Sequence, residues 1–366
     1  MNYSRRITKV QAILRRKKLD ALLVAQPENR RYLSGYSPPD HGIGESSGLL
    51  LIPAKGDPLL LTDFRFKLQA EAEVAFLPVL LYPKGLPALL KELLPDLKIR
   101  SLGFESDYTL YSFAGKLKAL GEKIGVQCVP TTGLVEGLRL IKDEDELAKL
   151  RLSVALNEKV FDEVYSSLSP GRTERDIALI IESTMRSMGA ESPSFSTIVA
   201  TGSNSALPHA VPGPVAIERG QPLMIDMGLV LDGYCSDMTR TFVLGKPDDR
   251  FYAVHRLVRR AQLAALAAIR AGIVAAAVDK IARDIIAAAG YGQAFGHSLG
   301  HGVGLAVHEE PRLSARNRKQ LKAGMVVTVE PGIYIPGWGG VRLENMVVIR
   351  EDGCELLNKN LTGLDL

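Results

Sequence analysis

Cysteine is scarce in this sequence, and long apolar runs are absent. The 366 residues include three cysteines, Cys128, Cys235 and Cys354, which are scattered and form no CxxC pair. This usage argues against a disulfide framework and a thiolate zinc site, and it favours a cytoplasmic location. No apolar run reaches the roughly 18 residues of a membrane-spanning helix, and the net charge of +4 is small for this length. We therefore expect neither a membrane nor a nucleic acid as partner.

Length and composition indicate two globular domains. Hydrophobic residues make up 46% of the chain and charged residues 23%, the balance of a globular protein. The basic segment Ser4–Leu19 could be a targeting peptide, but Ile7, Val10 and Leu14 form one helical stripe, and an apolar run follows directly. We interpret this segment as the first helix of a domain.

Residues 1–132 are expected to form an α/β domain, because short apolar runs alternate with helical stretches. No phosphate-binding glycine loop or cluster of titratable residues stands out there. The predicted strands are Ala21–Val24, Leu49–Ile52, Leu59–Leu61, Val74–Leu81 and Ser101–Phe104, and the predicted helices include Phe64–Ala72, Leu86–Leu94 and Leu110–Leu120.

Thr131–Gly133 is predicted to be a linker to a second domain, residues 133–366. Asp143 and Glu146 have the spacing of a capping box, which predicts a long helix from about Asp145 to Leu168. Pro170 and Gly171 would end this helix, and Thr173 would cap the next one.

The second domain contains an internal duplication. Ser169–Gly189 matches Arg270–Gly290 at an offset of 101 residues, and Gly220–Gly228 matches Gly324–Gly332 at 104. The segment GYCSD at 233–237 then matches GVRLE at 340–344 at an offset of 107. Such slowly drifting offsets predict an α+β domain of two related halves, each with helices followed by a β-hairpin.

The duplication places acidic residues in register. Asp226 matches Glu330, and Asp237 matches Glu344, so four carboxylates should converge between the halves. At about 4 Å and an effective dielectric constant of 20, each like-charged pair costs roughly 4 kcal/mol. Two divalent cations would balance these charges, and the absence of thiolates from the set favours manganese, cobalt, iron or zinc.

Histidines gather in the same region. His209, His297, His301 and His308 are four of the six histidines of the chain, and the last three share a glycine-rich stretch. A lone buried acid or lone histidine is more often structural than functional. The combination of acids in register with nearby histidines indicates a metal site.

Seven short segments surround these acids and histidines: His209–Pro212, Asp226–Gly228, Ser236–Thr241, Gly300–Leu305, His308–Pro311, Glu330–Tyr334 and Gly340–Glu344. They resemble the "pita-bread" metallopeptidase family M24, which includes methionine aminopeptidase, aminopeptidase P and prolidase. The resemblance covers residues 140–366 strongly, and residues 1–130 are similar to the N-terminal domain of the prolidase and aminopeptidase P branch.

The resemblance implies a function and a role for each residue. It implies hydrolysis of Xaa-Pro peptides, as a dipeptidase or an aminopeptidase, by a hydroxide that bridges two divalent metals, with Mn²⁺ or Co²⁺ favoured over Zn²⁺ or Fe²⁺. Glu330 would also be the general base, and His308 and His209 would stabilise the carbonyl oxygen. His297, Arg342 and Tyr334 would contact the proline side of the substrate or assist proton transfer, and Glu309 is a weaker candidate. The implied metal ligands are Asp226, Asp237, His301, Glu330 and Glu344.

Two other functions are compatible with parts of the pattern. Gly296–Gly300 matches the G-x-S-x-G motif of serine hydrolases, with Ser298 as nucleophile, but no acid lies between Ser298 and the following histidines. The same fold could also serve as a non-catalytic binding module, although all five ligand positions are filled. A homodimer is expected, in which the loop Ser37–Ser47 with His41 could reach the active site of a neighbouring subunit.

Overall fold

The computed structural model describes residues 1–365. The chain divides into two compact units, Met1–Arg139 and the remainder from Leu140 onward, called here the N-terminal and C-terminal units. No helix in the described part of the chain is both long enough and apolar enough to cross a membrane.

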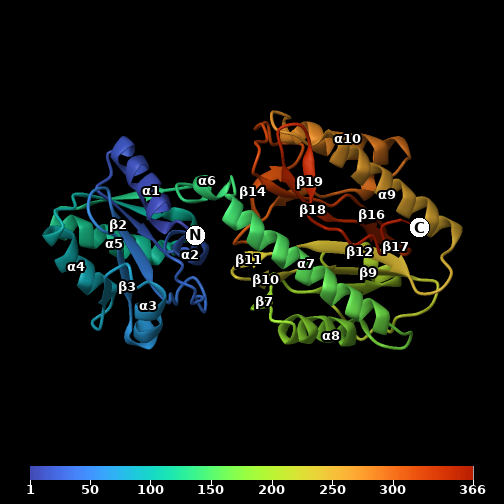
Figure 1. The fold of residues 1–366 in the computed structure, drawn as a ribbon, viewed down its shortest axis with the longest axis horizontal. Coiled ribbons are helices and arrows are strands. Elements are labelled where there is room, and N and C mark those ends of the chain that lie inside the picture. Colours follow the sequence, from blue (N-terminus) through green and yellow to red (C-terminus); the bar gives the residue numbers. More distant parts are fainter. Residues whose placement is uncertain (366) are drawn as a thin grey trace. The chain divides into compact units, whose positions relative to one another are not determined.

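The N-terminal unit is built on one six-stranded sheet of order β4-β3-β2-β1-β5-β6 (Figure 1). β2 is antiparallel to both of its neighbours, and the other pairs are parallel. The strands are β1 (Ala21–Val24), β2 (Leu49–Pro53), β3 (Leu59–Thr62), β4 (Val79–Leu81), β5 (Ser101–Glu105) and β6 (Gln127–Thr131).

Helices complete this unit, as the alternating pattern predicts. Leu90, Leu94 and Leu117, on two of the helices, pack in a common core with the sheet. The helices are α1 (Tyr3–Lys17), α2 (Pro27–Ser34), α3 (Lys67–Glu73), α4 (Leu86–Asp96), α5 (Tyr111–Ile124) and α6 (Glu136–Arg139), with 3₁₀ turns η1 (Phe64–Phe66) and η2 (Ser106–Tyr108).

The predicted strand Val74–Leu81 is wrong over its first five residues. Val74 instead ends α3, where its N–H donates to the carbonyl of Ala70, and only Val79–Leu81 pairs as β4. Pro78 has no N–H to donate to a strand ladder, which helps to explain the late start of the strand.

The C-terminal unit begins with two helices and two small sheets. α7 starts at the predicted capping box, in which Asp143 and Glu146 exchange hydrogen bonds, and Thr173 caps α8 as predicted. The sheets have the orders β12-β9-β8 and β11-β10-β7. The elements are α7 (Glu144–Ser167), α8 (Glu174–Ser187), β7 (Ser192–Pro193), β8 (Ile198–Thr201), η3 (Gly202–Ala206), β9 (Pro222–Met227), β10 (Leu229–Leu231), β11 (Tyr234–Cys235) and β12 (Met238–Val243).

The second half repeats this plan, with a helix pair followed by strands of order β14-β13-β15-β18-β19 and the hairpin β16-β17. The elements are α9 (Asp249–Ala268), α10 (Ala275–Ala288), η4 (Gly292–Ala294), β13 (Gly300–Gly302), β14 (Glu309–Leu313), β15 (Val326–Val329), β16 (Gly332–Ile335), β17 (Gly339–Arg342), β18 (Asn345–Ile349) and β19 (Cys354–Leu356).

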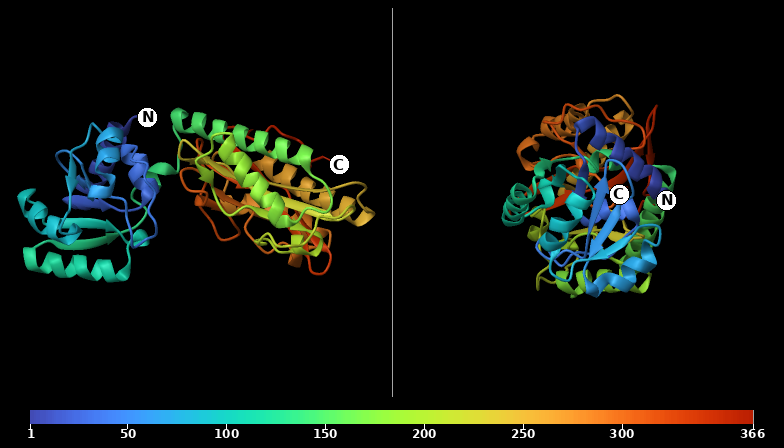
Figure 2. Two further views of the ribbon diagram at one scale, coloured as in Figure 1. Left: turned by 90° about the horizontal axis from the view of Figure 1, so that it is seen from below. Right: turned by 90° about the vertical axis from the view of Figure 1, so that its left-hand side faces the viewer.

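The predicted duplication is confirmed. Each half pairs two antiparallel strands next to the acids, β9 with β12 and β15 with β18. Helices α7 and α8 cover the first half, and α9 and α10 cover the second (Figures 1 and 2). The halves meet where the Glu344 N–H donates to the carbonyl of Thr239 and the Thr241 hydroxyl donates to that of Arg342.

Candidate metal centre

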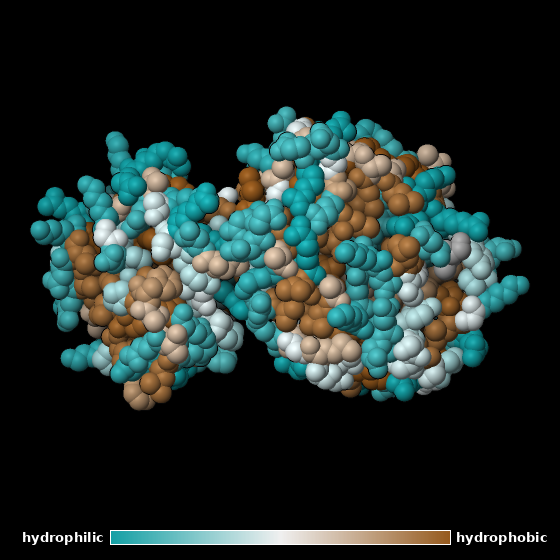
Figure 3. Space-filling view, in the orientation of Figure 1, coloured by the Kyte–Doolittle hydropathy of each residue, from teal (hydrophilic) through white to brown (hydrophobic). Residues whose placement is uncertain are grey.

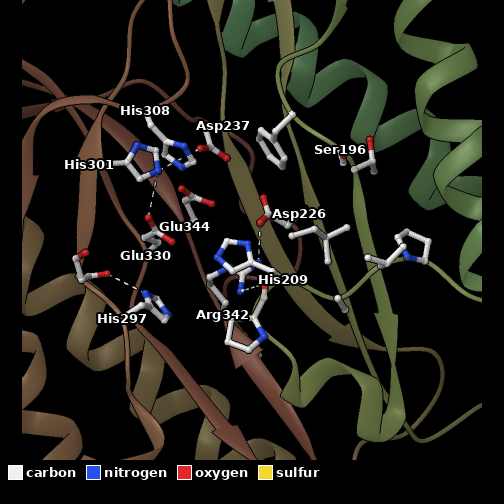
Figure 4. A pocket seen from close by; sticks show the side chains of 18 of the residues that line it. Ser196, His209, Asp226, Asp237, His297, His301, His308, Glu330, Arg342 and Glu344 are labelled. Atoms are coloured by element: carbon white, nitrogen blue, oxygen red, sulfur yellow. Dashed lines mark hydrogen bonds and ion pairs between the residues drawn. The ribbon is translucent and has the colours of Figure 1, made fainter. Parts of the chain in front are cut away.

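The four predicted acids lie at the inner ends of the paired strands. Asp226 is in β9, and Asp237 directly precedes its partner β12. Glu330 directly follows β15, and Glu344 lies between β17 and β18. In Figure 4, their carboxylates and the imidazole of His301 point toward one region of the cavity. The register read from the duplication therefore brings together all five predicted ligands.

His301 lies close to an acid from each half of the duplicated domain. Its Nε2 atom lies 3.5 Å from Asp237 Oδ2 and 3.3 Å from Glu330 Oε1. The ligand atoms of Asp237, His301 and Glu344 all lie within 4.8 Å of one another. These three side chains are buried, so their charges are poorly screened by water.

Burial is the largest cause of the pKa shifts in this cluster when no cation is bound. Burial, followed by repulsion from Glu344, raises the pKa of both Asp237 and Glu330 well above their ordinary values. Burial and the charge of Asp226 raise the pKa of Glu344 to about 8. Burial also lowers the pKa of His301 to about 4, so this imidazole is neutral near pH 7.

The donor set fits divalent cations. His301 Nδ1 lies 3.0 Å from the carbonyl oxygen of Gly302, so the proton is on Nδ1 and the Nε2 lone pair faces the carboxylates. A lone pair and carboxylate oxygens repel one another unless a cation lies between them. Asp226 Oδ1 is also buried without a hydrogen-bond partner within residues 1–365. A buried carboxylate oxygen without a donor is expected of a metal ligand. So is a histidine whose second ring nitrogen has a backbone partner.

Arg342 and Tyr334 form a buried network beside Asp226. Arg342 Nη2 donates to Asp226 Oδ2 at 2.6 Å, and Nη1 donates to the Tyr334 hydroxyl at 2.8 Å. The Tyr334 hydroxyl lies 2.9 Å from His297 Nε2. His297 Nδ1 faces the carbonyl oxygen of Ser298, which makes Nε2 the acceptor for the phenolic proton. The sequence predicted these three side chains as substrate contacts, and the geometry connects them to one of the predicted metal ligands.

The acids open into a cavity of about 470 Å³. His308 lies beside His301, with ring centroids 4.4 Å apart, and His209 lies across the cavity in the loop after η3 (Figure 4). The other lining residues include Phe195, Ser196, Thr197, Ile198, Val211, His297, Ser298, Arg312 and Arg342.

Three residues of the site escaped the sequence reasoning. Thr239 donates its hydroxyl to Glu344 Oε2 at 2.6 Å, and Thr328 donates to Glu330 Oε1 at 3.2 Å. Arg312, on β14, adds a cation to the cavity wall. In the sequence, only its position four residues after His308 indicated that it could belong to the site. Glu309 is absent from the cavity lining; its carboxylate accepts from Lys142 Nζ and the Ala306 N–H.

Comparison with known proteins agrees with this arrangement. The model of metallopeptidase family M24 matches residues 148–351, and that of the creatinase/prolidase N-terminal domain matches residues 6–141. This chain belongs to metallopeptidase family M24. The fold and family implied by the sequence motifs are thereby confirmed, and this is a family of metal-dependent peptidases with two metal ions. Membership also sets aside the serine hydrolase alternative.

Proteins and solved structures similar to this chain match along nearly its whole length. An Xaa-Pro dipeptidase of Pyrococcus horikoshii is 36% identical over 97% of each chain. The structure of an Xaa-Pro dipeptidase from Bacillus anthracis has a TM-score of 0.90 at 37% identity and covers 98% of each chain. The structure of an X-Pro aminopeptidase from Thermotoga maritima has a TM-score of 0.85 at 36% identity and covers 94% of this chain and 96% of its own.

Proposed function

We propose that this protein hydrolyses the peptide bond between an N-terminal residue and proline, with dipeptides as its preferred substrates. The observation that carries the proposal is the set of four converging carboxylates and one neutral histidine at the base of a cavity of about 470 Å³. Relatives that match nearly the whole chain are named Xaa-Pro dipeptidases. The nitrogen of proline in such a bond carries no N–H, so recognition must come from other groups of the substrate.

We propose that Asp226, Asp237, His301, Glu330 and Glu344 hold two divalent metal ions, with manganese or cobalt favoured by the oxygen-rich donor set. When bound, the metals would supply a water molecule of lowered pKa and polarise the substrate carbonyl. The orphaned oxygen of Asp226 and the lone pair of His301 support this assignment.

The protein's own groups would carry the proton and stabilise the developing charge. Glu330 would accept the proton of the attacking water and pass it to the proline nitrogen as the C–N bond breaks, while the Thr328 hydroxyl orients its carboxylate. His308 and His209 line the cavity and would donate hydrogen bonds to the carbonyl oxygen as it becomes an oxyanion. Burial, followed by the charge of Arg312, lowers the pKa of His308, so it would donate as a neutral imidazole.

The preference for dipeptides rests on Arg312. The other arginine of the cavity wall, Arg342, has its donors engaged with Thr239, Pro208, Tyr334 and Asp226. Arg312 is exposed and forms no ion pair with the residues that the structure describes, so its guanidinium is available to a substrate carboxylate. A dipeptide presents that carboxylate directly after proline, whereas a longer peptide places an amide there. We propose that Arg342 shapes the proline side of the cavity and that Arg312 binds the carboxylate.

The decisive experiment compares Ala-Pro, Ala-Pro-Ala and Met-Ala-Ser as substrates of Mn²⁺-loaded protein. We expect rapid cleavage of Ala-Pro and slow or no cleavage of the other two peptides. Rapid cleavage of the tripeptide Ala-Pro-Ala would make the protein an aminopeptidase. Cleavage of Met-Ala-Ser alone would refute the assignment to proline, and no cleavage with any divalent metal would favour a binding module.

The same experiment tests the role of Arg312. Arg312→Ala should raise KM for Ala-Pro by about tenfold to a hundredfold, because a charge-assisted bond of about 1.5–3 kcal/mol is lost. Arg316→Ala is the matched control, since Arg316 is an exposed arginine outside the cavity lining. An unchanged KM in Arg312→Ala would contradict the carboxylate assignment.

We further propose a cytoplasmic homodimer. The N-terminal unit exposes large apolar side chains, with Phe64 83% and Leu68 80% accessible, and Figure 3 shows apolar groups on its visible face. His41 is exposed at the tip of a loop whose base is fixed by the buried pair Arg30–Asp40. A sedimentation measurement tests the dimer, and a His41→Ala variant with unchanged kinetics would argue against a role at a neighbouring site.

A further inference from the structure

Helix α10 carries a buried ion pair outside the cavity. Asp279 is fully buried, and Arg283, one turn later on the same helix, is 31% exposed. Arg283 Nε and Nη2 donate to the two carboxylate oxygens of Asp279 at 2.9 and 2.8 Å. Such a bidentate pair has a fixed geometry, because both groups are planar.

The pair reaches three backbone groups of one segment, Phe295–Leu299. Arg283 Nη1 donates to the carbonyl of Phe295, and Nη2 donates to the carbonyl of His297, each at 2.8 Å. Asp279 Oδ1 accepts the Leu299 N–H at 3.1 Å. The guanidinium also stacks over the ring of Phe295, 4.3 Å from its centroid. The groups of the pair that do not bond each other therefore reach this segment through three hydrogen bonds.

This segment connects to the metal centre at two of its residues, His297 and Leu299. At His297, the imidazole contacts the Tyr334 hydroxyl, which in turn binds Arg342 and hence Asp226. At Leu299, the carbonyl accepts the N–H of Glu330 at 2.8 Å. A displacement of the segment would therefore move one wall of the cavity and the backbone of one metal ligand together.

We propose that Asp279 and Arg283 are positioning residues, which hold the segment Phe295–Leu299 so that His297 meets Tyr334 and Leu299 meets Glu330. The inference rests on the proposed function and adds to it two residues that touch neither substrate nor metal. A misplacement of about 1 Å far from the chemistry can reduce turnover strongly.

Arg283→Lys is the informative variant. Lysine keeps the charge opposite Asp279 but cannot direct three planar donors to the carboxylate and to two carbonyls. The neighbouring pair Lys280–Asp284 supplies the control, because it has the same spacing on the same helix and its side chains are 71% and 62% exposed. Asp284→Asn removes that ion pair without affecting the segment.

We expect Arg283→Lys to keep the fold but to raise KM for Ala-Pro and lower kcat in Mn²⁺-loaded protein, so that kcat/KM falls about tenfold to a hundredfold. In metal-free protein, the ¹⁵N resonances of the His297 ring, assigned with His297→Gln, should shift from the pattern of an Nδ1-protonated ring. Asp284→Asn should leave KM and these resonances unchanged.

Wild-type KM and His297 resonances in Arg283→Lys would overturn the proposal, and the pair would then be purely structural. Failure of the wild-type protein to cleave any peptide would refute the proposed function, while the resonances of metal-free protein would still decide the positioning role.

Discussion

Because of the buried acid Glu344, the stability of the metal-free protein should fall as pH rises. A salt-bridged carboxylate has the opposite effect, because it makes stability rise with pH. Its folded-state pKa is about 8, raised by burial and then by Asp226, against an ordinary value of 4.5. Between pH 4.5 and pH 8, Glu344 is ionised in the unfolded chain but protonated in the folded protein. The stability contributed by protonated Glu344 is therefore complete below pH 4.5 and is lost as pH rises through 8, at about 1.4 kcal/mol per pH unit.

Glu344→Gln removes this titration. The free energy of unfolding of the wild-type protein should fall relative to the variant by about 2 kcal/mol between about pH 6.0 and pH 7.5. Urea titrations in the presence of a chelator measure this difference in unfolding free energy. Fluorescence of the single tryptophan, Trp338, reports the unfolding of the C-terminal unit alone.

Two comparisons make this prediction refutable. Glu351→Gln, at an exposed position, should track the wild-type protein at every pH. A difference between wild type and Glu344→Gln that is constant with pH would show that Glu344 is ionised in the folded, metal-free protein. Saturating Mn²⁺ should reverse the trend for the wild type, because ligands must lose their protons to bind metal.

Three further substitutions test single roles. Glu330→Gln should lower kcat by about 10²–10⁴-fold with the fold retained, and near-normal turnover would exclude it as the base. Asp237→Asn should reduce the metal content measured by elemental analysis below two ions per chain, and an unchanged stoichiometry of two would contradict its assignment as a ligand. Glu174→Gln should weaken the loop that carries His209, because its carboxylate accepts the N–H groups of Thr201 and Gly213. We expect a loss of about 1–3 kcal/mol in unfolding free energy and a raised KM, whereas a normal KM would limit Glu174 to stability.

The sequence predicts those parts of the fold that follow from local patterns. The capping box of Asp143 and Glu146 is visible as a three-residue spacing and forms as predicted. The convergence of Asp226 and Glu330 could be predicted because the two residues match across the duplication. Matching strand ends of two related halves lie in equivalent positions. Local reasoning failed at Val74, where an apolar run continues through the end of a helix into a turn.

The supporting residues of the site could not be predicted in this way. Thr239 and Glu344 are 105 residues apart, and their hydrogen bond forms where the two halves meet. Asp279 resembles any acid of an amphipathic helix, and its burial and its bond to the Leu299 N–H follow from tertiary packing. Contacts between distant segments depend on the packed structure, so no spacing along the chain indicates them.

Buried acids in this protein fall into two groups by the donors that reach them. Glu105 accepts the N–H groups of Ala25 and Gln26 and the amide of Asn29, which occupy its carboxylate at the ends of two parallel strands. The carboxylate of Asp237, in contrast, receives no hydrogen bond from the described residues and faces the lone pair of His301. Burial alone therefore does not mark a functional acid, since protein donors can satisfy it. An acid that the fold buries and leaves without donors, as it leaves Asp237, requires a cation.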